Sequence, residues 1–220
     1  NADKITKDVV LNGFRELRKV QIHLCQNLRL YRYLVAFFDY SMAVQTVMLV
    51  ATYFGEQEIN WAGDSEKTSG LIISILVIQL VAVLGATLTS KASEKFGNIP
   101  TLIFVNTIWA IICVFAYFVT EPIHFYITAG FVGLVMGGIQ ALSRSTYSKF
   151  LPKTDDTASY FSFYDVAEKI GIVIGMVIYG LIDQITGSMR NAIVFLGVFF
   201  VAGLILLLRV PKNAVIEEMD

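Results

Sequence analysis

The sequence predicts an all-α, polytopic membrane protein with six transmembrane helices. Hydrophobic residues make up 55% of the 220-residue chain and charged residues only 16%, whereas soluble domains contain about 25% charged residues. Six apolar stretches are long enough to cross a bilayer, which takes about 20 residues for a hydrocarbon core of about 30 Å. Lysine and arginine also concentrate in alternate connections between these stretches, which is typical of a multi-pass membrane protein.

Residues 1–33 are expected to form a cytoplasmic amphipathic linker. If the segment is helical, apolar side chains share one face and basic side chains lie opposite, namely Val10, Phe14, Leu17, Leu24 and Leu28 against Arg15, Lys19 and Arg29. Such a helix lies on a membrane surface or packs against a bundle, and a solvated linker helix is the open alternative. Because the chain starts with Asn1 rather than Met, we expect it to be processed or to be part of a longer protein.

The six predicted spans form one transmembrane domain over residues 34–210. In chain order they cover residues 34–54, 71–89, 101–120, 125–142, 163–185 and 191–208. Residues 211–220 follow the last span, are acidic, and are expected to form a short frayed cytoplasmic tail.

The charges beside the spans predict the orientation in the membrane. Fifteen lysine and arginine residues lie on the side of the termini and of the second and fourth connections, whereas only Lys67 and Arg190 lie on the other side. Positively charged connections stay in the cytoplasm. We therefore expect both termini to be cytoplasmic, and the membrane to be the plasma or inner membrane if the source is bacterial.

Asp39 is an ionisable residue inside the first span. An unpaired carboxylate in the membrane would cost on the order of 3 kcal/mol or more. The residue is therefore either a proton or substrate site, or an interfacial aspartate neutralised by an arginine such as Arg32. The sequence alone leaves both interpretations open.

Other polar residues predict which spans surround a cavity. Gln45, Gln79 and Gln140 lie in spans one, two and four, and together with Asp39 they are our candidates for a substrate or ion cavity. The last span has no polar side chain over residues 192–208 and is expected to face lipid. Spans one, two, four and five should line the cavity, with span three intermediate.

A group of charged residues lies where the fourth span ends and the fifth begins. Arg144 could pair with Asp165 or Glu168, while Asp165 and Lys169 are four residues apart and share a helix face. These four residues are our candidates for a network that gates the cytoplasmic side. A static ion pair that fastens the bundle would use the same residues, so that alternative stays open.

Small and aromatic residues give weaker expectations about packing. Two glycine pairs have the small-xxx-small spacing that lets helix backbones approach, Gly133 with Gly137 and Gly171 with Gly175. Eight aromatic residues lie near the predicted span ends and are expected to form an interfacial belt: Tyr31, Tyr33, Tyr53, Trp61, Tyr117, Tyr126, Tyr147 and Tyr160.

Several other function classes lack their sequence signatures. The balance of 17 basic and 18 acidic residues argues against a nucleic-acid binder, which usually carries a basic excess. The chain contains no GxxxxGK[ST], HExxH or GxSxG motif, and Cys25 and Cys113 do not have the spacing of metal ligands. We therefore expect a protein that is not an enzyme and that uses no metal or cofactor; an intramembrane enzyme relying on His124 is the alternative.

Two longer motifs carry a family resemblance. Residues 137–152 (GGIQALSRSTYSKFLP) and 161–171 (FSFYDVAEKIG) resemble the second half of major facilitator superfamily transporters. More narrowly, they resemble the branch that contains the fungal vacuolar autophagy-related amino-acid effluxer and its bacterial relatives. Members of that branch tend to carry Asp-Gly just before a Val-Gln-Thr sequence, where this chain has Met42-Ala43. Asp39, three residues earlier, is a candidate substitute.

The resemblance implies a twelve-helix transporter built from two six-helix halves, each made of two three-helix inverted repeats. The chain would be the C-terminal half, helices seven to twelve, of a secondary active transporter that moves a small polar solute, such as an amino acid, by alternating access. Expected partners are the solute, membrane lipid and the missing N-terminal half, without which this half should self-associate; nucleic acid is not expected. A self-contained six-helix assembly or interaction module is the alternative.

Overall fold

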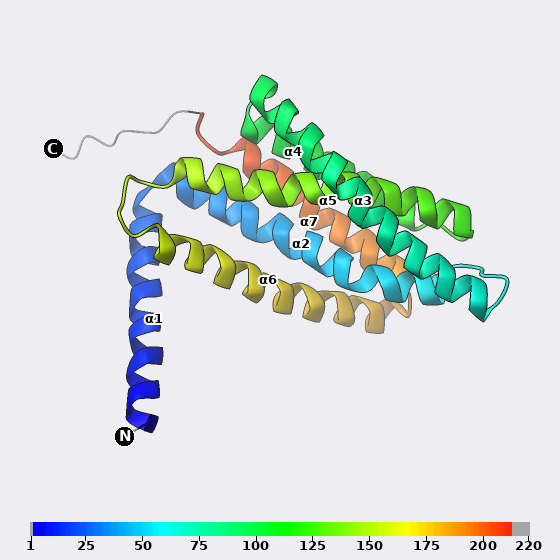
Figure 1. Cartoon of the computed structure of the whole chain (residues 1–220), viewed down its shortest axis with the longest axis horizontal. Coiled ribbons are helices and arrows are strands. Elements are labelled where there is room, and N and C mark those ends of the chain that lie inside the picture. Colours follow the sequence, from blue (N-terminus) through cyan, green and yellow to red (C-terminus); the bar gives the residue numbers. More distant parts are fainter. Residues whose placement is uncertain (1, 213–220) are drawn as a thin grey trace.

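The computed structural model describes residues 2–212, with the side chains of residues 8–212. This part of the chain contains no strand and seven helices (Figure 1): α1 (Ala2–Gln26), α2 (Leu28–Glu58), α3 (Asp64–Phe96), α4 (Asn98–Ala116), α5 (Pro122–Phe150), α6 (Thr157–Thr186) and α7 (Met189–Leu208). Helices α2 to α7 run along one bundle, and each corresponds to one of the six predicted spans, although α4 ends at Ala116, four residues before the predicted end of the third span. The predicted all-α fold is therefore confirmed.

Helix α1 lies across one end of the bundle rather than along it (Figure 1). Asn27 separates it from α2, because the Asn27 side-chain oxygen accepts a 3.2 Å hydrogen bond from the backbone N–H of Leu30 and so caps α2. Val20 and Leu24 are buried, and α1 packs against α6 and α2. The predicted linker of residues 1–33 is therefore not one helix: α1 ends at Gln26, and Leu28 and Arg29 belong to the start of α2.

The remaining helix ends follow from local chemistry. Gly97 separates α3 from α4 with φ +93°, and Gly187 ends α6 with φ +66°, a region of backbone conformation that favours glycine. Pro122 occupies the first turn of α5, where its missing N–H costs nothing. Asp156 and Ser188 cap α6 and α7 through their side-chain oxygens. Short connections join the successive helices, and each successive pair from α2 to α7 packs together except α5 and α6, whose backbones lie further apart.

The packing repeats itself between two three-helix units, α2–α4 and α5–α7. Helix α3 packs on α5 as α6 packs on α2, and α4 packs on α5 as α7 packs on α2. Helices α4 and α7, the third members of each unit, pack on one another. Exchanging the two units therefore reproduces these contacts, which is the pattern expected of a pair of inverted repeats.

The glycine pairs lie at the helix contacts that they were predicted to make. A Cβ atom added at Gly133 would come within 2.7 Å of the carbonyl oxygen of Ile78 in α3, and one at Gly137 would overlap the carbonyl of Ala82. In α6, Gly171 and Gly175 lie against α2, where a Cβ at Gly171 would be 3.6 Å from Met42. The predicted close approach is confirmed, and it is closer between α3 and α5 than between α2 and α6.

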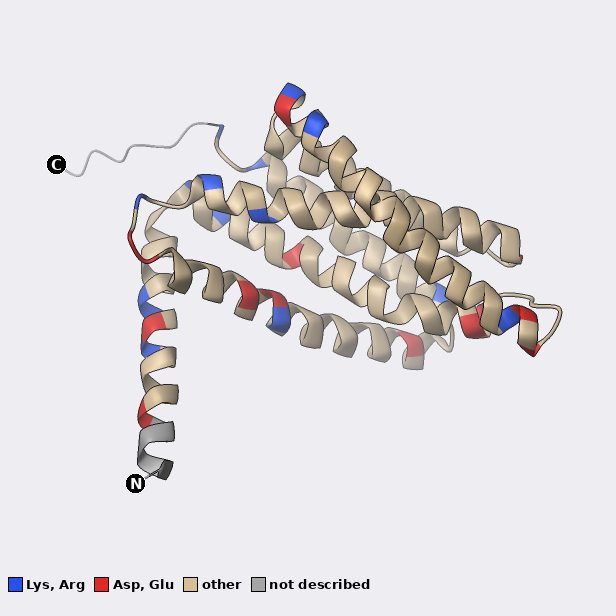
Figure 2. Cartoon of the chain, viewed as in Figure 1, with Lys and Arg blue, Asp and Glu red and all other residues tan. Residues whose placement is uncertain are grey.

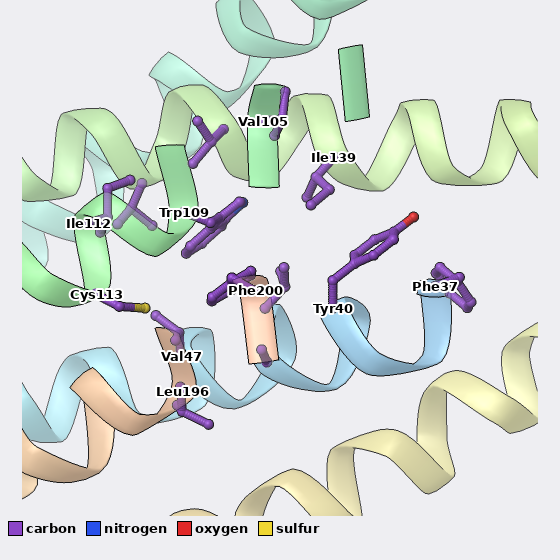
Figure 3. Packing of buried hydrophobic residues seen from close by; sticks show 14 of the residues in the cluster. Phe37, Tyr40, Val47, Val105, Trp109, Ile112, Cys113, Ile139, Leu196 and Phe200 are labelled. Carbon is purple, nitrogen blue, oxygen red and sulfur yellow. The ribbon is translucent and has the colours of Figure 1, made fainter. Parts of the chain in front are cut away.

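The core of the bundle lies between α2, α4, α5 and α7. Trp109 of α4 stacks on Phe200 of α7 with ring centroids 5.3 Å apart and planes only 6° from parallel (Figure 3). Both side chains are fully buried, as is Cys113 one helical turn away. This packing joins the third helices of the two repeats.

Five helices, α2, α3, α4, α5 and α7, are long and apolar enough to cross a membrane. Helix α6 is not among these five and carries Asp165, Glu168, Lys169 and Asp183, although residues 170–182 contain no charged side chain. Figure 2 shows most lysine and arginine residues at the end of the bundle where α1 lies, and acidic residues beside the α2–α3 connection at the opposite end. The connections that were grouped by charge in the sequence thus lie at opposite ends.

Three of the eight aromatic residues assigned to an interfacial belt lie inside the bundle instead. Tyr33, Tyr147 and Tyr160 are buried, and the hydroxyl group of Tyr147 donates a 2.7 Å hydrogen bond to the carbonyl oxygen of Tyr160. The belt assignment was wrong for these residues because nearness to a span end does not distinguish a lipid-facing side chain from one that joins two helices. Tyr31, Tyr53 and Tyr117 are exposed, as a belt requires.

Candidate functional site

A cavity of about 440 Å³ lies between α2, α5 and α6. Its volume falls in the range of small-molecule sites, about 300–1,000 Å³. Both apolar and polar side chains line it: Phe37, Tyr40, Ser41, Val44, Gln45, Ile139, Gln140, Ala141, Ser143, Arg144, Tyr164 and Glu168. Four of these are residues that the sequence singled out: Gln45, Gln140, Arg144 and Glu168.

Helical spacing explains why these residues meet. On α2, the lining positions 37, 40, 41, 44 and 45 follow the three- and four-residue intervals of one helix face. On α5, positions 140, 141 and 144 do the same, and on α6 Tyr164 and Glu168 are four residues apart. The cavity is thus formed by one face of each of three helices.

Hydrogen bonds to Ser143 fix the wall between α2 and α5. The hydroxyl groups of Tyr40 and Ser143 lie 2.7 Å apart, and the Tyr33 hydroxyl donates a 2.6 Å hydrogen bond to the Ser143 carbonyl oxygen. Figure 3 shows Tyr40 extending from α2 towards α5. Buried tyrosine hydroxyls need such partners, so these two bonds hold α2 at a defined position against α5.

Gln45 and Glu168 connect α2 with α6 across the cavity. The Gln45 amide Nε2 donates a 2.9 Å hydrogen bond to Glu168 Oε1. Both side chains are partly buried, and no lysine or arginine neutralises Glu168 among the ion pairs of residues 8–212. The Glu168 carboxylate is therefore a negative charge that faces the cavity with one neutral partner.

Arg144 brings a positive charge to the same cavity. Its Nη1 atom donates to Asp165 Oδ1 at 3.2 Å, and its guanidinium lies 5.2 Å from the Phe161 ring centroid and 5.5 Å from that of Tyr164. About half of each side chain in the ion pair is exposed. The expected contact between Arg144 and Asp165 is present, whereas Glu168 binds Gln45 rather than Arg144.

Asp39 does not line this cavity. It lies on the side of α2 that faces α7. Its Oδ2 atom would be 3.1 Å from a Cβ atom added at Gly203 of α7. Arg32, the proposed neutralising partner, donates instead to the carbonyl oxygen of Arg209. Oδ2 of Asp39 is buried and has no hydrogen-bond partner within residues 8–212. Asp39 and Gln45 are six positions apart, which places them on different faces of one helix. Our prediction that the two share one cavity is therefore corrected: Gln45 lines the cavity and Asp39 does not.

Gln79 and Lys169 lie outside the cavity as well. Gln79 is exposed on α3, on a face that the described helices leave uncovered. Lys169 is exposed on α6 and forms no ion pair with Asp165 among residues 8–212, although the two share a helix face. The eight candidate residues therefore divide into five that contribute to the cavity or its rim and three that do not.

The sequence reasoning missed two aromatic residues that shape the cavity, Tyr40 and Tyr164, and the contacts that Ser143 makes there. Tyr33 and Tyr40 are seven residues apart and therefore share a helix face, and this spacing could have indicated that both point at the same neighbour. Only the structure shows that the neighbour is Ser143. Within the described residues, no group of three or more His, Cys, Asp or Glu side chains could hold a metal ion.

Comparison with known families decides what kind of protein carries this cavity. A family model described as "Vacuole effluxer Atg22 like" matches residues 2–219. The chain belongs to the Atg22-like vacuole effluxer family. The match covers the whole bundle, α1 included, so the resemblance inferred from residues 137–152 and 161–171 is confirmed. An Atg22-like chain with these apolar helices is an integral membrane protein.

Individual relatives agree with this family assignment. An uncharacterized MFS-type transporter, YxiO of Bacillus subtilis, is 32% identical over 206 residues, which are 93% of this chain and 46% of the relative. Autophagy-related protein 22 is 27% identical over 184 residues in Eremothecium gossypii and 25% identical over 191 residues in Saccharomyces cerevisiae, covering 78% and 81% of this chain and 35% and 34% of the relatives. The chain thus spans less than half of the length of these relatives.

Proposed function

We propose that this Atg22-like chain forms the C-terminal half of a secondary active transporter that moves a zwitterionic solute, an amino acid, by alternating access. The observation that carries the proposal is the pair of opposite charges, Arg144 and Glu168, on one cavity of about 440 Å³. The transporter relatives and the vacuole effluxer family support the general activity.

An amino acid would match both charges. Its carboxylate would be the ligand of the Arg144 guanidinium, which can bind a carboxylate through two N–H groups. Its ammonium group would be the ligand of the Glu168 carboxylate, which Gln45 holds in place from α2. Gln140 and Ser41 supply further hydrogen-bonding groups on the same wall. A solute with only one charge would leave the other cavity charge unpaired, which costs free energy.

The Arg144–Asp165 pair would act as a cytoplasmic gate. Exposed ion pairs contribute about 0–1 kcal/mol, so this half-exposed pair is too weak to fasten the bundle permanently. A solute carboxylate that attracts Arg144 would compete with Asp165 for the guanidinium. Solute binding and opening of the pair would then be coupled, as alternating access requires.

A second half would cover the exposed face of α3. Gln79 lies on that face with large apolar neighbours, including Leu76, Leu80 and Val83. A glutamine that faces lipid in a membrane span is costly, so a protein surface fits this face better than lipid does. We propose the N-terminal half as the cover. Without it, the same face would drive self-association. The charge pattern favours a cytoplasmic location for both termini.

Transport in proteoliposomes tests the proposal. The full-length transporter, reconstituted with a radiolabelled amino acid mixture, should catalyse uptake that unlabelled alanine inhibits. Propionate lacks the ammonium group of alanine and ethylamine lacks the carboxylate, so neither should inhibit at the same concentration. Inhibition by either analogue as strong as that by alanine would contradict the two-charge site.

A matched pair of variants on α6 localises the effect. Glu168→Gln should lower transport at least tenfold, because the ammonium group loses its only negatively charged ligand. Asp183→Asn makes the same charge change near the far end of α6, outside the cavity lining, and should leave transport near the wild-type level. Equal transport by Glu168→Gln and the wild type would exclude Glu168 from the site.

A further inference from the structure

A second and larger cavity, of about 800 Å³, lies at the basic end of the bundle. The start of α2, the turn between α3 and α4, the end of α5 and the end of α7 surround it. It shares no lining residue with the cavity between α2, α5 and α6. A ligand of this cavity would therefore bind separately from a solute at the proposed transport site.

The charges of this cavity are all positive. Arg29, Lys149 and Lys212 line it, and no acidic side chain does. Lys149 Nζ donates to the neutral amide oxygen of Asn98 at 3.2 Å. The Arg29 guanidinium lies 3.9 Å from the Phe150 ring centroid, and its buried Nε has no hydrogen-bond partner within residues 8–212. No ion pair among the described residues neutralises any of the three cations.

The first turn of α4 adds to this positive field. Helix α4 begins at Asn98 inside the cavity lining, and no side chain caps its N-terminus. The unpaired N–H groups of a helix N-terminus carry partial positive charge and attract anions. Three cations and a helix N-terminus therefore converge on one concave surface, which favours a ligand with a negatively charged group.

The rest of the lining is apolar. Phe96, Ile99, Ile103, Leu207 and Leu208 contribute side chains. Phe96 and Leu208 are more than 60% exposed, so this apolar lining continues onto the outer surface of the bundle. A free inorganic anion would contact the cations but would leave the apolar lining in water. An amphipathic anion would satisfy both parts of the cavity.

We propose that this cavity binds an anionic phospholipid of the leaflet at the basic end of the bundle, with the headgroup phosphate on Arg29, Lys149 and the α4 N-terminus and the acyl chains on the apolar side chains beside them. Basic pockets between membrane helices on the cytoplasmic side are suited to such headgroups. Lys212 would contribute from the segment that follows α7.

Native mass spectrometry of the purified chain in detergent tests this site. The probes are dioleoylphosphatidylglycerol, which is anionic, and dioleoylphosphatidylcholine, which has the same acyl chains but no net charge. We expect one phosphatidylglycerol molecule to be retained at least tenfold more tightly than phosphatidylcholine. Inorganic phosphate at matched ionic strength should not displace it. Displacement would indicate a free-phosphate site, and equal retention of the two lipids would indicate annular lipid; either result overturns the proposal.

Charge-neutralising variants locate the binding. Lys149→Gln and Arg29→Gln should each weaken phosphatidylglycerol binding about fivefold, because a basic residue near an anionic lipid surface is worth about 1 kcal/mol. Lys153→Gln removes a charge from the same end of the bundle outside the cavity lining and should not change binding. If Arg29→Gln does not fold because the contact with Phe150 is lost, Lys149→Gln together with Lys212→Gln carries the test. A loss in Lys153→Gln equal to that in Lys149→Gln would overturn the site.

Discussion

Arg190 and Glu58 join the start of α7 to the end of α2 through two hydrogen bonds. Arg190 Nε donates to Glu58 Oε2 at 2.7 Å, and Arg190 Nη2 donates to the Glu58 carbonyl oxygen at 2.8 Å. Nη1 of the same guanidinium donates to the carbonyl oxygens of Tyr117 and Val119, just after α4. One side chain thus supplies donors to carbonyl groups at the ends of two helices, which have no intrahelical partners.

Arg190→Gln should therefore destabilise the bundle by about 2–4 kcal/mol, because hydrogen bonds to a charged group contribute about 1.5–3 kcal/mol each. Unfolding in mixed detergent micelles measures the change. Lys67→Gln is the control, since Lys67 is 3.9 Å from Glu56 in a partly exposed pair on the same side of the protein. A loss of stability no larger for Arg190→Gln than for Lys67→Gln would contradict the role of Arg190.

The contact between α3 and α5 predicts the effect of two alanine substitutions. A Cβ atom at Gly85 would overlap the carbonyl oxygen of Leu134, whereas one at Gly130 would meet nothing within 4 Å. Gly85→Ala should lower stability by about 1–3 kcal/mol, the usual cost of overpacking. Gly130→Ala should be neutral or raise stability by up to about 1 kcal/mol, because alanine is the better helix former. The same unfolding assay applies, and equal effects would refute the close approach.

If α1 lies on the membrane surface, its apolar face should lie deeper in the membrane than its polar face. Phe14 is 68% exposed, while Lys19 lies on the polar face beside Glu16. Nitroxide labels at Phe14→Cys and Lys19→Cys, with Cys25 and Cys113 replaced by serine, can be compared in liposomes. A membrane-surface helix predicts that oxygen, which partitions into lipid, relaxes the label at 14 more strongly. Equal access of a water-soluble relaxant to both labels would favour the solvated linker.

The proposed gate predicts a change in labelling of the cavity. Ala141 lines the cavity near Arg144, so Ala141→Cys in a full-length transporter without other reactive cysteines reports access from the cytoplasm. Arg144→Ala removes the ion pair with Asp165 and should speed labelling by a membrane-impermeant maleimide several-fold. Lys153→Ala, outside the lining, should not change the rate. An unchanged rate in Arg144→Ala would make Arg144 a static contact.

The hydropathy pattern was sufficient to predict the six helices of the bundle, whereas the two three-helix repeats were implied only by the family resemblance. Each apolar stretch of about 20 residues corresponds to one helix of the bundle, because hydrocarbon allows few other backbone conformations. Helix ends were less predictable. Helix α3 runs from Asp64 to Phe96, well beyond the apolar residues 71–89, because polar residues can continue a helix outside the hydrocarbon region.

The cavity was predicted only in part. Gln45, Gln140 and the Arg144–Asp165 contact followed from polarity and from the short connection between α5 and α6. Asp39 was misplaced because polarity does not tell which side of a helix a residue occupies. Tyr33 and Tyr147 were assigned to the lipid interface for the same reason. Their partners, Ser143 and Tyr160, lie on other helices, and the sequence does not indicate which side chains meet across a helix boundary.

The glycine contacts give the bundle unequal stiffness. Gly85, Gly133 and Gly137 bring the α3 and α5 backbones together, and two backbones in contact deform little. Helix α6 lies at the edge of the bundle (Figure 1), and the α2 atoms nearest to Gly171 and Gly175 belong mostly to side chains, including those of Met42 and Thr46, which can change rotamer. Helix α6 is therefore the compliant wall of the cavity and α5 the rigid one. A solute that binds to both walls would therefore move Glu168 on α6 towards Arg144, while Arg144 on α5 would stay in place.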